Sequence, residues 1–417
     1  MVRDLGVTNE FLNNNLATTG KIQQVGSDRF LGKNLGSGSG NTDQVQPWYD
    51  VQVPDWTQNQ HTAQWSTLQY YLSSVAATNS LVPVSSNYTS SFGSFPGGAT
   101  FVGGVVAPNG YVYLVPAFVS KYYKINPIDN SVTSFGTTPW DGNQLGAFNG
   151  GVLAPNGKIY FIPSGTTMCY GVDPSSDTIF SFGGFTGNTI VNNTSLYAEG
   201  VLAPNGKIYC FPYRSSLCQV IDPSNNSVAS FGTFVQSGNG PGGVLAPNGK
   251  IYMSIDTSSV AKIIDPSNNT VTAFATLSFN PGSANGVVAP NGKIYMADST
   301  SYGIVIDPSN NTITSFGTFA FAAGAEGQKA VVLPNGYLYF FAHKGTLAHV
   351  VDPSNNTVTS FAITHGGTGI GSYHGGVQTL NGKLIYVPHA STSALSVNFL
   401  FHNYFNPNYI TSPIAKP

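Results

Sequence analysis

The stretch that decides the fold is GVVAPNGKIYMADSTSYGIVIDPSNNTITSF, residues 286–316. It contains four short segments rich in β-branched and aromatic residues, a composition that predicts four strands. Pro-Asn-Gly at 290–292 predicts a turn after the first strand, because Pro presets φ and Gly accepts a left-handed conformation. Asp-Pro-Ser-Asn-Asn at 307–311 predicts another turn, in which Asp caps its own backbone and Asn becomes left-handed. The stretch therefore predicts one four-stranded antiparallel unit.

This unit recurs along the chain. The asparagine of its first turn stands at Asn109, Asn156, Asn205, Asn248, Asn291, Asn335 and Asn381. The second turn phrase begins at Asp222, Asp265, Asp307 and Asp352, with variants at Asp173 and Asn126. Seven units of four strands, 43 to 49 residues apart, are the pattern of a β-propeller.

The last unit lacks its fourth strand, and the missing strand stands before the first unit. Residues 86–95 (SNYTSSFGSF) match residues 310–319 (NNTITSFGTF) at five of ten positions. We expect this N-terminal strand to pair with the segment ALSVNFLF, residues 394–401, and to close the ring. The predicted fold is all-β, a seven-bladed β-propeller of four-stranded blades whose N-terminal strand completes the last blade.

Residues 293–316 also carry a family resemblance. The sequence KIYMADSTSYGIVIDPSNNTITSF resembles the YVTN-type seven-bladed propellers, and the resemblance extends over residues 86–402. Such propellers occur in surface-layer proteins, cell-surface adhesins, lyases and lactonases. The resemblance therefore implies the fold and leaves the function open.

The two ends of the chain do not follow the repeat. Residues 1–85 include a linker-like stretch at 35–43 and apolar residues at helical spacing in 61–77, which predict one short helix in an otherwise irregular segment. This helix either packs beneath the ring or anchors it to a larger assembly. We expect three parts: an N-terminal segment over 1–85, the propeller over 86–402 and an extended C-terminal arm over 403–417.

Charge is scarce. Lys and Arg number 16 and Asp and Glu 18 among 417 residues, which is 8% where about 25% is usual. A net charge of −2 argues against nucleic-acid binding, and no apolar run is long enough for a membrane span. The start of the chain shows no apolar signal sequence, and we expect no insertion into a membrane.

Chemistry is expected on the face with the variable loops. His343, His365, His374 and His389 cluster there and are weak candidates for a metal site. The loops around them are rich in glycine and hold no carboxylate, so we expect hydrogen-bonding histidines and no cofactor.

The mouth of the central channel gives a second candidate site. One position of the innermost strands is occupied, in chain order, by Gly103, Gly150, Glu199, Gly242, Asn285, Lys329 and Gly375. Lactonase and lyase propellers need several carboxylates or metal ligands there, whereas Glu199 is the one carboxylate that this position offers. An acid–base pair needs two titrating groups, and this sequence therefore favours a protein that is not an enzyme.

Aromatic residues of the same face give a third candidate. Trp140, Tyr197, Phe279 and Tyr373, together with Glu199, could bind a ligand by stacking on sugar rings.

Abundant Ser, Thr, Asn and Gly with little charge resemble the composition of bacteriophage and other virion structural proteins, such as tail fibres. The main expectation is a non-enzymatic structural or attachment protein of a virion. Its partners would be other virion proteins, further copies of itself or a host surface glycan. The first alternative is an extracellular or cell-surface propeller that binds carbohydrate or protein, and the second is a lactonase or lyase-type enzyme.

Two smaller sets complete the expectations. Cys210 and Cys218 flank a short loop and either form a disulfide or remain buried free thiols. Lysines at the start of the second strands and aspartates of the last turns are expected on one face, as neighbouring charges or as plain turn residues. The lysines are Lys158, Lys207, Lys250, Lys293 and Lys383.

Overall fold

The computed structural model describes two groups of residues. These are the strand residues 22–24, 29–32 and 49–52, and residues 89–397 apart from 98–99, 141, 143–145, 167, 186–196, 234–241, 254–259, 277–285, 298–301, 320–328, 343–346 and 364–371. Strands, turns and loops make up these described residues, which include no helix. Accordingly, no helix in this part of the chain could cross a membrane. The predicted all-β class is confirmed.

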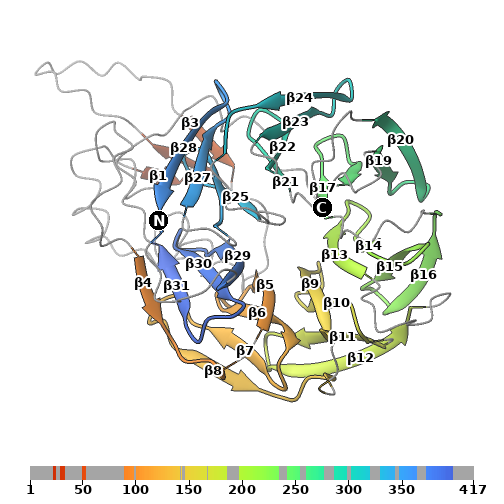
Figure 1. Cartoon of the computed structure of the whole chain (residues 1–417), viewed down its shortest axis with the longest axis vertical. Coiled ribbons are helices and arrows are strands. Elements are labelled where there is room, and N and C mark those ends of the chain that lie inside the picture. Colours follow the sequence, from red (N-terminus) through yellow and green to blue (C-terminus); the bar gives the residue numbers. More distant parts are fainter. Residues whose placement is uncertain are drawn as a thin grey trace, which may run out of the picture. The chain divides into compact units, whose positions relative to one another are not determined.

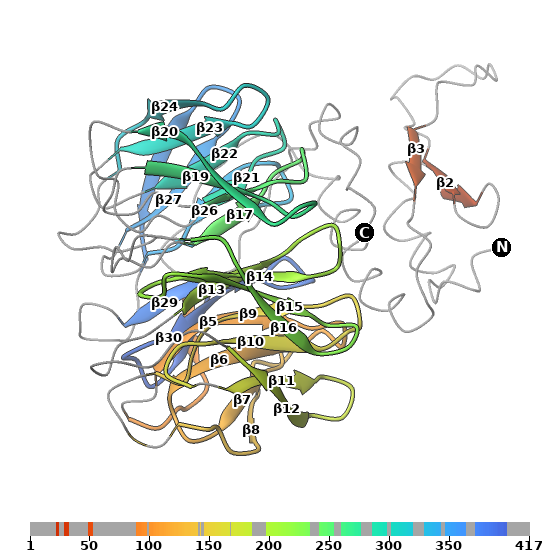
Figure 2. The same cartoon turned by 90° about the vertical axis from the view of Figure 1, so that its right-hand side faces the viewer.

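Seven four-stranded antiparallel sheets form the blades of a propeller. The innermost strands contact one another in chain order, from β5 through β9, β13, β17, β21 and β25 to β29, and β29 contacts β5. The ring is therefore closed, with the innermost strands around its centre (Figure 1). Figure 2 shows the same sheets from the side, with the strands of a blade lying next to one another.

The strands of each blade are given from the innermost outwards. Blades 1 to 3 consist of β5 (Thr100–Val106), β6 (Val112–Phe118), β7 (Tyr122–Ile125) and β8 (Val132–Phe135); β9 (Phe148–Leu153), β10 (Ile159–Pro163), β11 (Met168–Asp173) and β12 (Thr178–Gly184); and β13 (Tyr197–Leu202), β14 (Ile208–Pro212), β15 (Cys218–Asp222) and β16 (Ser227–Phe231). Blades 4 and 5 consist of β17 (Gly243–Leu245), β18 (Ile251–Met253), β19 (Val260–Asp265) and β20 (Thr270–Thr276); and β21 (Gly286–Val288), β22 (Ile294–Ala297), β23 (Gly303–Asp307) and β24 (Thr312–Phe316). Blades 6 and 7 consist of β25 (Ala330–Val332), β26 (Leu338–Phe340), β27 (Leu347–Asp352) and β28 (Thr357–Ala362); and β29 (Tyr373–Gln378), β30 (Leu384–Pro388), β31 (Ala394–Val397) and β4 (Thr89–Phe92).

Blade 7 closes the ring with a strand from the N-terminal side, as predicted. Strand β4 is antiparallel to β31, with Phe92 opposite Ala394 and Thr89 opposite Val397. Because β4 and β31 are some 300 residues apart in the chain, this pairing joins the two ends of the repeat region. The sheet edge that a three-stranded last blade would leave is thereby paired.

The chain divides into two units, and the propeller belongs to the second, Val82–Leu400 with Phe405–Pro417. The first unit, Met1–Leu81 with Phe401–Tyr404, contains a three-stranded antiparallel sheet. Its strands are β1 (Ile22–Gln24), β2 (Arg29–Gly32) and β3 (Tyr49–Gln52). These three strands were not expected from the sequence. The helix expected in 61–77 and the arm expected over 403–417 lie outside the described residues, so the three-part division stays a prediction.

The turns adopt the conformations that their residues favour. In the first turn of blade 2, the Gly157 amide donates to the Ala154 carbonyl at 3.0 Å, and Gly157 has a φ of 77°. In the last turn of blade 4, Asp265 Oδ1 accepts the Ser267 amide at 3.0 Å, and Asn269 has a φ of 58°. Both predicted turn types are confirmed.

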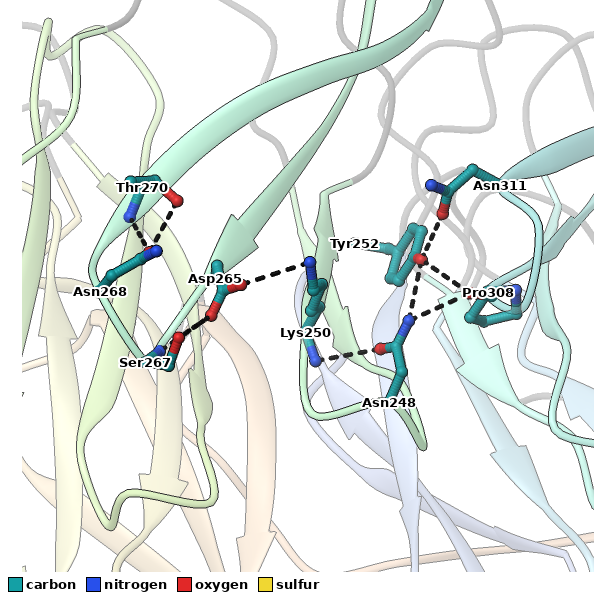
Figure 3. A network of polar contacts seen from close by, with 9 residues as sticks. All are labelled: Asn248, Lys250, Tyr252, Asp265, Ser267, Asn268, Thr270, Pro308 and Asn311. Atoms are coloured by element: carbon teal, nitrogen blue, oxygen red, sulfur yellow. Dashed lines mark hydrogen bonds and ion pairs between the residues drawn. The ribbon is translucent and has the colours of Figure 1, made fainter.

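Neighbouring blades are joined by a contact between these turns, which we call the latch (Figure 3). Asn248 Nδ2 donates to the Pro308 carbonyl of the next blade at 3.1 Å, and the Tyr252 hydroxyl donates to Asn311 Oδ1 at 2.6 Å. The same contact recurs at five junctions. The tyrosines are Tyr113, Tyr160, Tyr209, Tyr252 and Tyr295, each with its hydroxyl 2.5 to 2.8 Å from a carboxylate or amide oxygen of the following blade.

The latch changes at the two junctions of blade 7, which has no last turn of the repeated type. At the first, the Tyr339 hydroxyl lies 2.7 Å from the Tyr386 hydroxyl. At the second, Lys383 Nζ donates to the Pro127 carbonyl at 2.5 Å and to Asn130 Oδ1 at 2.9 Å.

The lysines and aspartates of the turns form pairs within single blades. Lys250 Nζ lies 3.3 Å from Asp265 Oδ2, and equivalent pairs occur in blades 2, 3 and 5. The Ser267 hydroxyl, the Ser267 amide and Lys250 hold the pKa of Asp265 below its ordinary value. Because the lysines of these pairs are 40 to 45% exposed, the pairs add little to stability.

Candidate functional site

Four innermost strands carry a residue with positive φ near their start. The φ angles are 139° at Gly103, 119° at Gly150, 49° at Glu199 and 65° at Gly375. Each residue lies where the pairing with the second strand shifts register, which marks a β-bulge. A bulged residue leaves the ladder and points its side chain in a new direction. These positions belong to the set that the sequence analysis placed at the channel mouth.

Glu199 departs from this pattern of glycines. It lies between Ala198, which is paired with Phe211, and Gly200, which is paired with Cys210. Every other non-glycine residue with positive φ among the described residues is an Asn or Asp in a last turn. A left-handed conformation costs an L-residue about 1–2 kcal/mol. Strain of this kind gathers at functional sites, because the fold must hold a side chain there against the local preference.

Lys329 reaches Glu199 from the other side of the ring. It directly precedes β25 in blade 6, and its Nζ lies 2.9 Å from Glu199 Oε1 of blade 3. The same Nζ donates to the Val102 carbonyl of blade 1 at 3.2 Å. The lysine side chain is 21% exposed and the glutamate side chain 23%. We refer to Val102, Gly103, Glu199, Lys329 and Gly375 as the inner-strand site.

The glycines of the neighbouring blades leave the room that this pair needs. A Cβ on Gly103 would lie 2.7 Å from Lys329 Nζ, and one on Gly375 would lie 2.7 Å from Lys329 Cδ. A Cβ on Gly150 would lie 2.7 Å from Glu199 Cα. Any side chain at these three positions would therefore displace a member of the pair.

The inner-strand site combines two groups of opposite charge, the Glu199 carboxylate and the Lys329 ammonium group. A carboxylate that is partly removed from water can accept a proton from a bound ligand. An ammonium group beside it can stabilise negative charge on a ligand oxygen. Both residues belong to the set of seven equivalent positions in the sequence, but only Glu199 was expected to act there, because an acid–base pair was expected to need a second carboxylate. The other members of that set are Gly242, which is buried, and Asn285, which lies outside the described residues.

The aromatic residues expected to bind a ligand lie in different surroundings. Tyr197 and Tyr373 are 0% and 2% exposed, so their rings belong to the core and offer no face for a sugar. The Tyr197 hydroxyl lies 2.9 Å from Ser215 Oγ, and burial raises its pKa to about 12. Trp140 is half-buried and packs edge-on against Phe118 at 6.2 Å. Phe279 lies outside the described residues.

Two of the four candidate histidines are described. The rings of His374 and His389 are stacked with their centroids 5.5 Å apart in blade 7. His343 and His365 lie outside the described residues. No group of three or more His, Cys, Asp or Glu that could hold a metal ion occurs among the residues that the structure describes. The expectation of hydrogen-bonding histidines without a cofactor in these loops stays a prediction.

A fifth histidine was not singled out from the sequence. His349, on β27, is fully buried and its ring centroid lies 5.2 Å from that of Phe319. Burial lowers its pKa to about 4. One histidine in the apolar strand LAHVVD is the sequence signal that could have identified it.

The cysteines are free thiols. Cys169, Cys210 and Cys218 are all buried and unbridged, so the disulfide considered between Cys210 and Cys218 does not form in this structure. Burial raises the pKa of the Cys210 and Cys218 thiols well above the ordinary value, which makes them poor nucleophiles.

Several solved structures share this fold. A catalytically inactive histidine-to-alanine variant of virginiamycin B lyase from Staphylococcus aureus, with quinupristin, superimposes with a TM-score of 0.61 at 12% identity, over 75% of this chain and 99% of that one. A streptogramin B lyase gives a TM-score of 0.58 at 11% identity, over 75% and 97%. The extracellular domain of a hybrid two-component system from B. thetaiotaomicron gives 0.55 at 10% identity, over 75% of this chain and 42% of that one. No protein-family model and no curated protein matches the sequence.

These findings correct the main functional expectation. The expectation of a non-enzymatic structural or attachment protein of a virion is wrong, as is the expectation that the chain is not an enzyme, because the similar propellers include lyases. Amino-acid composition is a poor guide to function here, because it describes the whole chain, whereas an activity depends on a few side chains held at one site. At 12% identity the likeness shows the fold alone. The expected partners and location stay predictions.

Proposed function

We propose that this chain is a lyase-type propeller enzyme in which Glu199 transfers a proton and Lys329 stabilises negative charge. The observation that carries the proposal is the conformation of Glu199, a left-handed bulge residue whose carboxylate is ion-paired across the ring. Three blades contribute to this contact, so the closed ring is required to assemble it. The lyases among the similar folds support the choice of reaction class.

The proposed reaction is an elimination next to a carbonyl group. The Glu199 carboxylate accepts a proton from the carbon beside the carbonyl, and the C–H electron pair forms a new double bond. The leaving group departs with the electrons of its bond and takes the proton back from Glu199. Lys329 donates a hydrogen bond to the carbonyl oxygen, which gains negative charge as the proton leaves. No water is consumed, and the two products together have the composition of the substrate.

Local structure holds the two groups in place for this step. Bulge geometry fixes the direction of Glu199, and its strain of about 1–2 kcal/mol is offset by packing of the surrounding blades. Lys329 is fixed at both ends, by the Gly375 surface along its stem and by the Val102 carbonyl at its ammonium group. Such preorganisation lowers the cost of arranging charges at the moment of reaction.

The repeat itself also fits this proposal. We infer that the repeat is of the YVTN type, supported by the sequence of residues 293–316. Carbohydrate binding has less support, because two of its four aromatic candidates are core residues.

The test is an elimination assay with the purified full-length chain. Quinupristin, the compound in one similar structure, and a panel of linear and cyclic esters serve as substrates. Mass spectrometry distinguishes elimination from hydrolysis, since hydrolysis adds the mass of one water. We expect Glu199→Gln and Lys329→Met each to lower kcat/KM by about 100-fold or more.

Matched controls come from an ion pair far from this site. Lys250→Met and Asp265→Asn remove the same types of group from the turns, and we expect both variants to retain activity. Absence of elimination by the wild-type chain would refute the proposal. So would a Glu199→Gln variant with activity close to that of the wild type.

A further inference from the structure

We propose that the Glu199–Lys329 pair selects a neutral carbonyl group and discriminates against a ligand that carries a carboxylate. This inference concerns the same site as the proposed function and rests on it. It specifies that the group bound at Lys329 is uncharged. This preference can be measured by ligand binding, without any turnover.

Lys329 has hydrogen-bonding capacity to spare. Its ammonium group has three N–H donors. Glu199 Oε1 at 2.9 Å and the Val102 carbonyl at 3.2 Å use two of them, and the described residues supply no third acceptor. Because the side chain is 21% exposed, the third donor is available to a ligand oxygen.

A ligand at Lys329 meets a site in which opposite charges are balanced. Lys329 and Glu199 together have no net charge, and the Val102 carbonyl adds its negative end to the same ammonium group. A neutral carbonyl oxygen accepts a hydrogen bond from Lys329 and is not strongly repelled by the Glu199 carboxylate. A carboxylate at the same place gains from Lys329 but is repelled by Glu199 at close range, where partial burial keeps the effective dielectric below that of water.

Glycines of two other blades lie against the Lys329 side chain. Gly103 faces Lys329 Nζ, and a Cβ there would lie 2.7 Å from it. Gly375 leaves equivalent room along the lysine stem. The two glycines therefore leave the space that the lysine occupies, and they place no side chain over its ammonium group.

Two probes that share every atom except the ester methyl group test the proposal. N-acetylphenylalanine methyl ester presents a neutral carbonyl, and N-acetylphenylalanine presents a carboxylate at the same position. Dissociation constants are measured by NMR titration with the full-length chain and with three variants, Glu199→Gln, Lys329→Met and the control Lys250→Met. Thermal unfolding of each variant establishes that it is folded.

We expect the wild type and Lys250→Met to bind the ester about tenfold more tightly than the acid. In Glu199→Gln the preference reverses, because the repelling charge is gone and Lys329 is left without its counter-ion. In Lys329→Met both probes lose affinity. An ester that does not bind the wild type, equal binding of both probes, or a Glu199→Gln variant with unchanged preference would overturn the inference.

The outcomes are distinguishable from those of the elimination assay. Selectivity for the ester with no turnover of any substrate would refute the lyase proposal and support the selection of a neutral carbonyl. Turnover that depends on Glu199 and Lys329, together with equal binding of both probes, would support the lyase proposal and overturn the selectivity.

Discussion

The latch and the inner-strand site both join residues from different blades, but they are built in opposite ways. At the latch, the same residue types make the same contact at five junctions, with a tyrosine hydroxyl 2.5 to 2.8 Å from an oxygen of the next blade. At the inner-strand site, Glu199 and Lys329 stand at a position where four other blades have glycine.

This difference separates stability from chemistry within one repeat. A contact that recurs at five junctions stabilises each of these blades against the next, and its left-handed positions hold Asn or Asp, which tolerate that conformation. A reactive pair must break the repeat, because equivalent charges in all seven blades would repel one another near the centre. At Glu199, which replaces the glycine found in other blades, the backbone is strained.

The largest expected effect is a loss of folding stability in acid. It arises from His349, which belongs to neither the latch nor the inner-strand site. The pKa of His349 is about 4 in the folded chain, below its ordinary value, so the unfolded chain binds more protons in acid. Stability is therefore complete at neutral pH and falls as the pH decreases from about 6.5 to about 4, by about 3 kcal/mol. Urea unfolding over this pH range measures the loss. A His349→Gln variant should lose this part of the pH dependence, and an unchanged profile would contradict the assignment.

Removing one hydroxyl from the latch should have the next largest effect. Tyr252→Phe leaves Asn248, Asn311 and the Pro308 carbonyl without their shared partner. We expect the free energy of unfolding to decrease by about 1–2 kcal/mol. Tyr302, which is 56% exposed, provides the matched control, since Tyr302→Phe should be close to neutral. Equal melting temperatures of both variants would show that the latch contributes nothing.

Substitution by glycine should change stability in opposite directions at the two kinds of left-handed residue, the bulge residue Glu199 and the turn residue Asn269. Glu199→Gly removes strain of about 1–2 kcal/mol and loses a partly exposed ion pair worth about 0–1 kcal/mol, so stability should rise by about 1 kcal/mol while elimination is lost. Asn269→Gly relieves less strain, because Asn tolerates the left-handed conformation, and it removes the acceptor of the Tyr209 hydroxyl, so it should destabilise the chain. Denaturant unfolding measures both changes. A clear destabilisation by Glu199→Gly would mean that Glu199 serves the fold rather than the chemistry.

The ion pairs of the turns should give the smallest effect. Lys250→Met removes a lysine that is 45% exposed and paired with Asp265. We expect the free energy of unfolding to change by less than about 0.5 kcal/mol, and less still at high salt. A loss of more than about 1 kcal/mol would show that the turn pairs stabilise the ring as the latch does.

Much of the fold could be predicted because its determinants are local and repeated. The phrases around Asn291 and Asp307 specify two turns, and their period specifies the blades. The match between residues 86–95 and 310–319 identified the closing strand β4. The helix expected in 61–77 rests on a single weak periodicity and lies outside the described residues. The strands β1 to β3 carried no repeat to reveal them.

The residues of the candidate site could be predicted from the sequence, but the contact between them could not. Glu199 stood out because it interrupts a series of glycines, and Lys329 interrupts the same series. Their contact could not be derived from spacing, because it joins residues 130 positions apart on different blades. The burial of Tyr197 was missed because an aromatic residue at the start of a strand has the same sequence signature in the core and on the surface.

The sequence by itself determined the number of blades, their four strands, their turns and the strand that closes the ring, because each depends on short-range hydrogen bonding repeated at a fixed period. Only the tertiary structure decided which exceptions to the repeat meet. Closing seven sheets around one axis brings residues of blades 1, 3 and 6 together, and it is this closure that places Lys329 between Glu199 and the Val102 carbonyl.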